Sequence, residues 1–204
     1  MMHATSFALT LALAVGSPSV TALADATPGK PAPDFAATDA TGATHTLSSY
    51  RGKVVVLEWS NHDCPYVRKH YGSGNMQALQ SQAAKEGVVW LTVVSSAPGR
   101  QGYVEGLEAQ KLTEDREAKP SAVLLDAQGS VGRLYGARTT PHMFVIDKAG
   151  NLAYAGAIDD RPSASRSSLD GARNYVSEAL AALRESRPLE VAATRAYGCS
   201  IKYR

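Results

Sequence analysis

The two cysteines of the chain, Cys64 and Cys199, are the residues best suited to covalent chemistry. Thiol–disulfide exchange needs one thiolate to attack a disulfide and a second sulfur to resolve the mixed disulfide that results. One pair of cysteines is enough for such a redox couple, and Cys199 is then the only candidate for the second sulfur. The same pair could instead form one structural disulfide in an oxidising compartment, and composition does not separate the two roles.

The position of Cys64 favours the reactive role. It lies in the segment Val54–Val67, which reads VVVLEWSNHDCPYV. The apolar start of this segment predicts a short strand buried on both faces. Pro65 suits the first position of a helix, which places Cys64 at a helix N-terminus, where the dipole and unpaired N–H groups favour a thiolate. Arg68 adds to this effect and Asp63 opposes it, while a buried structural cysteine is the alternative.

Glu58 is the one carboxylate in the apolar run. Burial among Val56, Leu57 and Trp59 would raise its pKa, so that it could hold a proton for exchange with a thiol. A strand acid that faces solvent or pairs with Lys53 is the other interpretation.

The remaining elements are predicted from periodicity and turn residues. Strands are expected at 88–94, 121–125, 140–147 and 152–155; helices are expected after Cys64 and at 76–85, 104–117, 131–135 and about 170–183, the last capped by Ser168 or Asp170. This order predicts an α/β fold in which a mixed sheet lies between helix layers.

The N-terminal residues predict export. Phe7–Val15 is apolar but too short to span a bilayer, and Ala22-Leu23-Ala24 is a small-x-small cleavage site. We therefore predict a signal peptide over residues 1–24, a periplasmic or secreted protein, and no membrane attachment after cleavage. One domain over 25–188 and a C-terminal tail at 189–204 that carries Cys199 complete the predicted organisation. The 21 Lys and Arg against 19 Asp and Glu form no long runs, which argues against a nucleic-acid partner.

At these residues the chain resembles the thioredoxin-fold redoxin family, the alkyl hydroperoxide reductase and thiol-specific antioxidant relatives, over roughly residues 31–183. Cys64-Pro65 follows the central strand, Glu58 lies six positions earlier, and Thr140-Pro141 opens a later hairpin. The resemblance implies a thioredoxin-like three-layer fold with helices on both faces of the sheet. It also implies that Glu58 relays protons and that Pro141 is the family's cis-proline, packed beside the reactive sulfur. A proline there removes a donor and leaves the neighbouring backbone free to pair with a substrate strand.

The chain departs from both branches of that family. Relatives that exchange disulfides carry Cys-x-x-Cys, whereas Val67 stands at the second position here. Peroxiredoxins carry Pro-x-x-x-Thr-x-x-Cys, and the matching positions here are Leu57 and Asn61, so the peroxide-activating hydroxyl is missing.

The histidines of the chain are candidate ligands for a metal ion. His62, Cys64 and His142 could gather at one end of the sheet, where sulfur and imidazole would suit copper. Copper chaperones of this fold use paired cysteines, which this motif lacks, and histidines in exposed loops are the simpler interpretation. We predict no metal or cofactor.

These observations predict an exported thiol–disulfide oxidoreductase that exchanges electrons with a thiol or disulfide protein partner. Cys64 is its predicted nucleophile, Cys199 its candidate resolving cysteine, and Glu58 and Pro141 the assisting residues. One alternative is an antioxidant peroxidase that reduces peroxides at Cys64 through a sulfenic acid. The other is a binding or structural module with an inert Cys64–Cys199 disulfide or a copper site.

Overall fold

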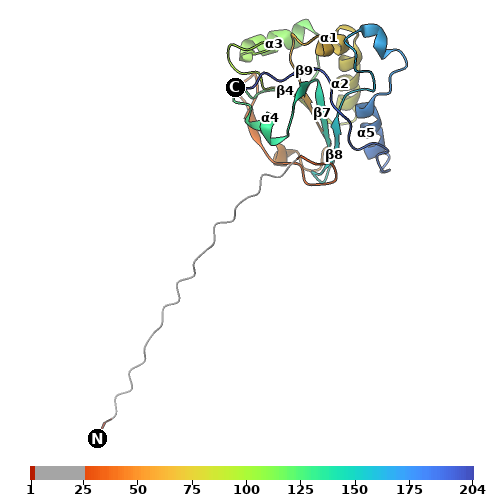
Figure 1. Ribbon diagram of the computed structural model, residues 1–204. Coiled ribbons are helices and arrows are strands. Elements are labelled where there is room, and N and C mark those ends of the chain that lie inside the picture. Colours follow the sequence, from red (N-terminus) through yellow and green to blue (C-terminus); the bar gives the residue numbers. More distant parts are fainter. Residues whose placement is uncertain (3–25) are drawn as a thin grey trace.

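A mixed five-stranded sheet forms the centre of the protein (Figure 1). The computed structural model describes residues 1–2 and 26–204, so the predicted signal peptide lies almost entirely outside the described residues. The strands are β1 (Ala36–Thr38), β2 (Thr44–Thr46), β3 (Val55–Trp59), β4 (Val89–Val94), β5 (Ala122–Leu125), β6 (Thr139–Thr140), β7 (His142–Ile146), β8 (Leu152–Gly156) and β9 (Cys199–Ser200). The α-helices are α1 (Pro65–Gly72), α2 (Asn75–Lys85), α3 (Gly106–Asp115), α4 (Ser130–Leu134) and α5 (Tyr175–Arg184), with 3-10 turns at Leu47–Tyr50 and Arg166–Leu169.

Strand β3 lies in the middle of the sheet, whose order is β5-β4-β3-β7-β8. It pairs in parallel with β4 and antiparallel with β7, and every residue of β3 and β4 is buried. Continuous apolar runs suit strands covered on both faces, which is why these two strands could be predicted from the sequence. The mixed sheet and its helix layers confirm the predicted fold class.

Alternate side chains of β3 face two different cores. Val55, Leu57 and Trp59 pack with the N-terminal segment and α4. Val56 packs on the opposite face with residues of α1, α2 and α5. Figure 1 shows these three helices together on one side of the sheet and α4 on the other. The period-two alternation of a strand thus fixes the side of the sheet on which each helix packs.

The last helix begins later than predicted. Asn174, not Ser168 or Asp170, is its N-cap, and the Asn174 side chain accepts a hydrogen bond from the Ser177 N–H at 2.9 Å. The segment before it forms a 3-10 turn, and Asp159 bridges to Asn174, so these residues are held in a structured loop that periodicity does not reveal.

The C-terminal tail (residues 189–204) returns across the sheet. Ala193 bridges Ala155 of β8, and β9 then pairs antiparallel with β6. In Figure 1 the dark-blue tail runs from the end of α5 to a C-terminus beside α3 and β4. The tail thereby passes over the end of β3, where the chain leaves the sheet for Cys64.

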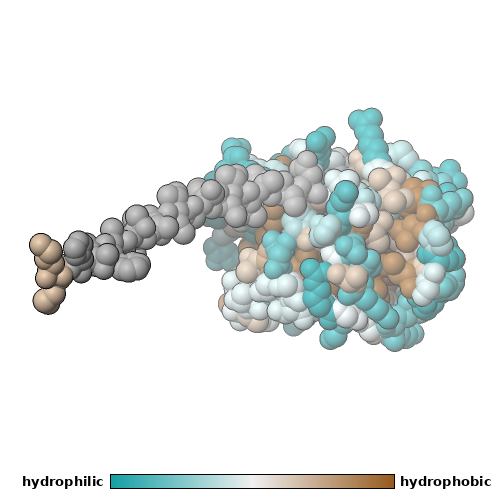
Figure 2. All heavy atoms as spheres, turned by 90° about the horizontal axis from the view of Figure 1, so that it is seen from below, coloured by the Kyte–Doolittle hydropathy of each residue, from teal (hydrophilic) through white to brown (hydrophobic). Residues whose placement is uncertain are grey.

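Hydrophilic side chains surround the apolar areas on the face shown in Figure 2. Among the described residues, the large hydrophobic side chains that stand exposed are those of Met1, Met2 and Leu107. No helix within the described part of the chain combines the length and the apolar character needed to cross a membrane.

Candidate active site at Cys64

Cys64 is the N-cap residue of α1, as predicted. Its backbone is extended, Pro65 is the first helical residue, and the Cys64 carbonyl accepts the Arg68 N–H at 2.9 Å. The side chain is fully buried, and its thiol donates a hydrogen bond to the carbonyl oxygen of Thr140 at 3.0 Å. The sulfur is therefore held at a helix N-terminus but is covered by other parts of the chain.

The cover over Cys64 is the C-terminal tail. The Thr140–Pro141 bond is cis, as predicted, and Thr140 in β6 pairs directly with Cys199 in β9. Gly198 permits this approach, because a Cβ added there would lie 2.0 Å from the Thr140 carbonyl oxygen and its φ is +138°. The backbone edge beside Pro141 was predicted to be free for a substrate strand, but the chain's own tail occupies it.

The two thiols influence each other's ionisation. Both are free, and each thiol shifts the pKa of the other. Burial would raise the pKa of Cys64, but the Cys199 thiol, the Thr140 side chain and the N–H of Val67 stabilise the thiolate and lower that pKa below its ordinary value. Burial and the neighbouring Cys64 sulfur raise the pKa of Cys199 to about 12. Cys64 is thus the thiol that ionises, and Cys199 the one that keeps its proton.

The guanidinium of Arg68 forms its hydrogen bonds with Asp63 and His62, not with either cysteine. It donates to the Asp63 carboxylate at 2.8 Å and to the His62 carbonyl at 3.0 Å. Arg68 forms an ion pair with Asp63, which offsets its positive charge. The groups that favour the Cys64 thiolate are mainly those of the tail and of β6.

Glu58 is fully buried and takes part in a hydrogen-bond network, so neither solvent exposure nor pairing with Lys53 describes it. Its carboxylate accepts hydrogen bonds from side chains of α1, α2 and β4: Tyr71 Oη at 2.9 Å, Trp90 Nε1 at 2.9 Å, Thr92 Oγ1 at 3.2 Å and Gln80 Nε2 at 3.3 Å. Burial raises the pKa of Glu58, and the bonds from Trp90 and Tyr71 only partly oppose this. Its hydrogen-bond partners include neither cysteine.

The histidines do not form the copper site that the sequence left open. Within residues 26–204, no three His, Cys, Asp or Glu side chains gather so that they could hold a metal ion. His142 packs on Phe144 with ring centroids 4.5 Å apart, and burial lowers its pKa to about 4. His70 lies fully buried in α1, so the interpretation of exposed-loop histidines is also wrong for this residue.

Asn61 stands at the position of the peroxide-activating threonine. It is buried; its Oδ1 accepts the Asp63 N–H at 2.9 Å and its Nδ2 donates to the Gln101 carbonyl at 3.3 Å. This amide stabilises the loop before Cys64, and it supplies no hydroxyl to a bound peroxide.

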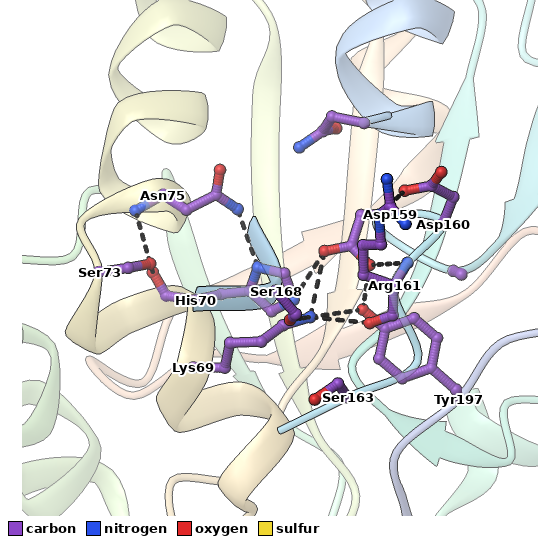
Figure 3. Close-up of polar contacts among 12 residues, drawn as sticks. Lys69, His70, Ser73, Asn75, Asp159, Asp160, Arg161, Ser163, Ser168 and Tyr197 are labelled. Carbon is purple, nitrogen blue, oxygen red and sulfur yellow. Dashed lines mark hydrogen bonds and ion pairs between the residues drawn. The ribbon is translucent and has the colours of Figure 1, made fainter. Parts of the chain in front are cut away.

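Sequence reasoning missed a second buried polar group near Cys64, made by Lys69, Asp159 and Tyr197 (Figure 3). Lys69 lies five residues after Cys64 and Tyr197 two residues before Cys199. Lysine is almost never fully buried unless it is paired, and only the folded chain brings its partners to it. The only indication in the sequence was that Lys69 and Tyr197 each lie within a few residues of a cysteine.

Comparisons with known proteins agree with this geometry. The AhpC/TSA family profile matches residues 28–155, which include Cys64 and Pro141 but end before Cys199. The thiol-disulfide oxidoreductase ResA of Geobacillus thermodenitrificans (strain NG80-2) is 33% identical over 125 residues, which are 61% of this chain and 66% of ResA. The match therefore spans slightly less than two thirds of that curated relative.

Solved structures show the same fold. A hypothetical protein from Sinorhizobium meliloti 1021 superposes with a TM-score of 0.72 at 23% identity and covers 87% of this chain and 95% of its own. A candidate thiol:disulfide interchange protein DsbE from Chlorobium tepidum is 28% identical, with a TM-score of 0.52 over 63% of this chain and 84% of its own.

Proposed function

The chain belongs to the AhpC/TSA family, and we propose that it is an exported thiol–disulfide oxidoreductase in which Cys64 is the nucleophile and Cys199 the resolving thiol. The observation that carries this proposal is the pairing of Cys199 with Thr140, whose carbonyl oxygen accepts the Cys64 thiol. The two cysteines, 135 positions apart in sequence, meet at one residue. A resolving sulfur must reach the first sulfur, and this geometry supplies one in place of the missing second motif cysteine.

The proposed reaction has two exchange steps. The Cys64 thiolate attacks one sulfur of a substrate disulfide, forms a mixed disulfide and releases the other substrate sulfur as a thiolate. Cys199 then loses its proton to that thiolate or to solvent and attacks the Cys64 sulfur, which releases the second substrate thiol and leaves a Cys64–Cys199 disulfide. A dithiol protein partner reduces this disulfide by the same chemistry and becomes oxidised itself.

The difference in pKa between the thiols suits these roles. Attack requires a thiolate, and the Cys64 pKa is lowered, whereas the Cys199 pKa of about 12 keeps that thiol protonated until the first step has removed its negative neighbour. Once Cys64 is in a mixed disulfide, its charge no longer raises the pKa of Cys199. The resolving thiol therefore becomes more acidic when it is needed.

Glu58 and Pro141 have assisting roles in this proposal. Glu58 is a buried carboxyl whose raised pKa favours its protonated form, so it can hold a proton, although its contacts require that solvent carries the proton to a sulfur. Pro141 presents no N–H, so the edge at Thr140 offers its carbonyl both to the Cys64 thiol and to a paired strand. A protein substrate could pair with this edge after β9 has left it.

The relatives support the class of reaction and of partner. ResA and the DsbE structure are named for thiol–disulfide chemistry, which implies thiol or disulfide proteins as substrates for this chain too. Two observations support export. Residues 1–24 have the pattern of a signal peptide. A pair of cysteines that forms a disulfide is also better suited to a compartment outside the reducing cytosol.

Trapping of mixed disulfides tests the proposal. The Cys199→Ser variant should accumulate mixed disulfides at Cys64 with partner proteins, since no sulfur remains to resolve them. The Cys64→Ser variant should accumulate none, and acid-quenched, alkylated samples analysed by mass spectrometry give both answers. Equal behaviour of the two variants and the wild type would refute the proposal. Rapid peroxide-dependent sulfenylation of Cys64 would support the peroxidase instead.

A further inference from the structure

A buried network of charged and polar groups joins α1, the loop after β8 and the C-terminal tail (Figure 3). The Lys69 ammonium donates to Asp159 Oδ2 at 3.2 Å, to the Arg161 carbonyl at 3.0 Å and to Tyr197 Oη at 3.0 Å. The Lys69 side chain is 0% exposed and that of Asp159 is 1% exposed. Tyr197 Oη donates in turn to the other carboxylate oxygen of Asp159, which closes a three-residue ring of hydrogen bonds.

This ring holds the tail beside the redox pair. Tyr197 is two residues before Cys199, and its ring packs edge to face on Tyr66, two residues after Cys64, with centroids 5.7 Å apart. The Lys69 ammonium also lies over the Tyr197 ring, 5.2 Å from its centroid. Residues that follow Cys64 therefore contact a residue that precedes Cys199. These contacts are separate from the active-site contacts described above.

Net stability does not explain the network. Removing a lysine and an aspartate from water is costly, and a buried ion pair is often no more stabilising than apolar side chains of the same volume. Such pairs are better suited to fixing one arrangement, because any other arrangement leaves a buried charge without its partner. Here the arrangement that is fixed is the position of Tyr197, and with it the start of β9.

We propose that Lys69, Asp159 and Tyr197 are positioning residues that set the effective concentration of Cys199 at Cys64. The inference rests on the proposed function, in which these two thiols form the redox disulfide. A tail held in place converts disulfide closure into a preorganised intramolecular step, whereas a loose tail must be ordered each time. The network thereby tunes how readily the pair is oxidised, without contact with either sulfur.

The test measures the equilibrium of the reduced protein with glutathione disulfide, in which one protein disulfide and two glutathione thiols form. Tyr197→Phe removes the hydroxyl from the network and keeps the ring that packs on Tyr66. Its equilibrium constant should fall by roughly tenfold, which corresponds to the loss of one hydrogen bond to a charged group. A double variant, Lys69→Met with Asp159→Leu, removes the charged pair together and should lower the constant at least as much.

Tyr135→Phe is the matched control. It also removes one hydroxyl from a buried tyrosine, which donates to the Pro33 carbonyl at 2.7 Å and not to a residue of the tail. Its unfolding midpoint should fall while its glutathione equilibrium stays that of the wild type. If Tyr197→Phe and the double variant also keep the wild-type constant, the positioning role is refuted. If the wild type forms no Cys64–Cys199 disulfide at any glutathione ratio, the proposed function itself fails.

Discussion

Cys199 lies directly opposite Thr140 in the β6–β9 pair, so the tail occupies the backbone edge next to the reactive cysteine. Thr140 contacts both halves of the site, since its carbonyl oxygen also accepts the Cys64 thiol at 3.0 Å. Because one residue accepts the Cys64 thiol and also pairs with the backbone of Cys199, the arrangement has consequences for stability, for thiol ionisation and for the exchange reaction.

The close passage of the tail depends on Gly198. Gly198→Ala should separate β9 from β6, because the new Cβ would lie 2.0 Å from the Thr140 carbonyl oxygen. We expect the free energy of unfolding to fall by about 2 kcal/mol and the Cys64–Cys199 disulfide to form more slowly. Chemical denaturation and oxidation kinetics measure these effects. Gly171→Ala is the control, since φ there is +66° but an added Cβ meets nothing within 4 Å. Equal results for the two variants would mean that the tail is not held at this point.

The hydroxyl of Thr140 is buried without a hydrogen-bond partner, and the Thr140 side chain is one of the groups that lower the pKa of Cys64. This hydroxyl is therefore available to donate a hydrogen bond to the Cys64 thiolate. Thr140→Val keeps the shape and removes this donor, so the pKa of Cys64 should rise. The rate of Cys64 alkylation as a function of pH, in a Cys199→Ser background, measures the change. Thr139→Val serves as control because its hydroxyl donates to the Pro141 carbonyl instead. An unchanged Cys64 pKa would show that the hydroxyl does not reach the sulfur.

The buried His70 predicts sensitivity to acid. Burial, and then the charge of Lys69, lower the pKa of His70 from 6.5 to about 4. Between these values the unfolded chain binds a proton that the folded chain does not, so stability falls as pH decreases from 6.5 and levels off below 4. The loss from this one group is up to about 3 kcal/mol.

His70→Asn should remove that loss while it keeps an acceptor for the Asn75 amide, which lies 2.8 Å from His70 Nδ1. Urea denaturation at several pH values measures the effect. The variant should retain the acid-induced loss of stability that is due to His142, because burial also lowers the pKa of that residue to about 4. A wild type equally stable at pH 4 and pH 6.5 would contradict the expected burial of neutral imidazole.

Local patterns in the sequence sufficed to predict the central sheet and the Cys64 helix terminus. The apolar run before Cys64 and the following Pro65 specify a strand and a helix start by rules that act within a few residues. The family resemblance added the cis bond at Pro141, which the structure contains. These features need no knowledge of the rest of the chain.

What could not be predicted depends on contacts between distant segments. Asn174, the cap of α5, also bridges to Asp159, and Lys69 is paired in the interior by Asp159 and Tyr197, which lie far along the chain from it. The juxtaposition of Cys199 and Cys64 was predicted only by exclusion of other sulfurs. No local rule states that a tail beginning near residue 189 returns to pair with Thr140.

Glu58 provides the last test, because its burial and its proposed proton storage make separate predictions. An acid with a raised folded pKa favours the protonated form in the fold, so its stabilising contribution is present below 4.5 and lost as pH rises through the folded pKa. Glu58→Gln cannot ionise and should therefore gain stability relative to the wild type as pH rises.

Storage of a catalytic proton predicts a change in the reaction as well. Glu58→Gln should lower the turnover of a disulfide substrate by roughly a hundredfold and remove one limb of its pH profile. Thr92→Val is the matched control, since it deletes one hydrogen bond of 3.2 Å to the carboxylate and leaves the acid in place. If Glu58→Gln changes the dependence of stability on pH but leaves the pH profile of turnover intact, the carboxylate only joins α1, α2 and β4. Because its four donors come from those elements and none comes from a thiol, only the turnover profile can assign Glu58 to the chemistry.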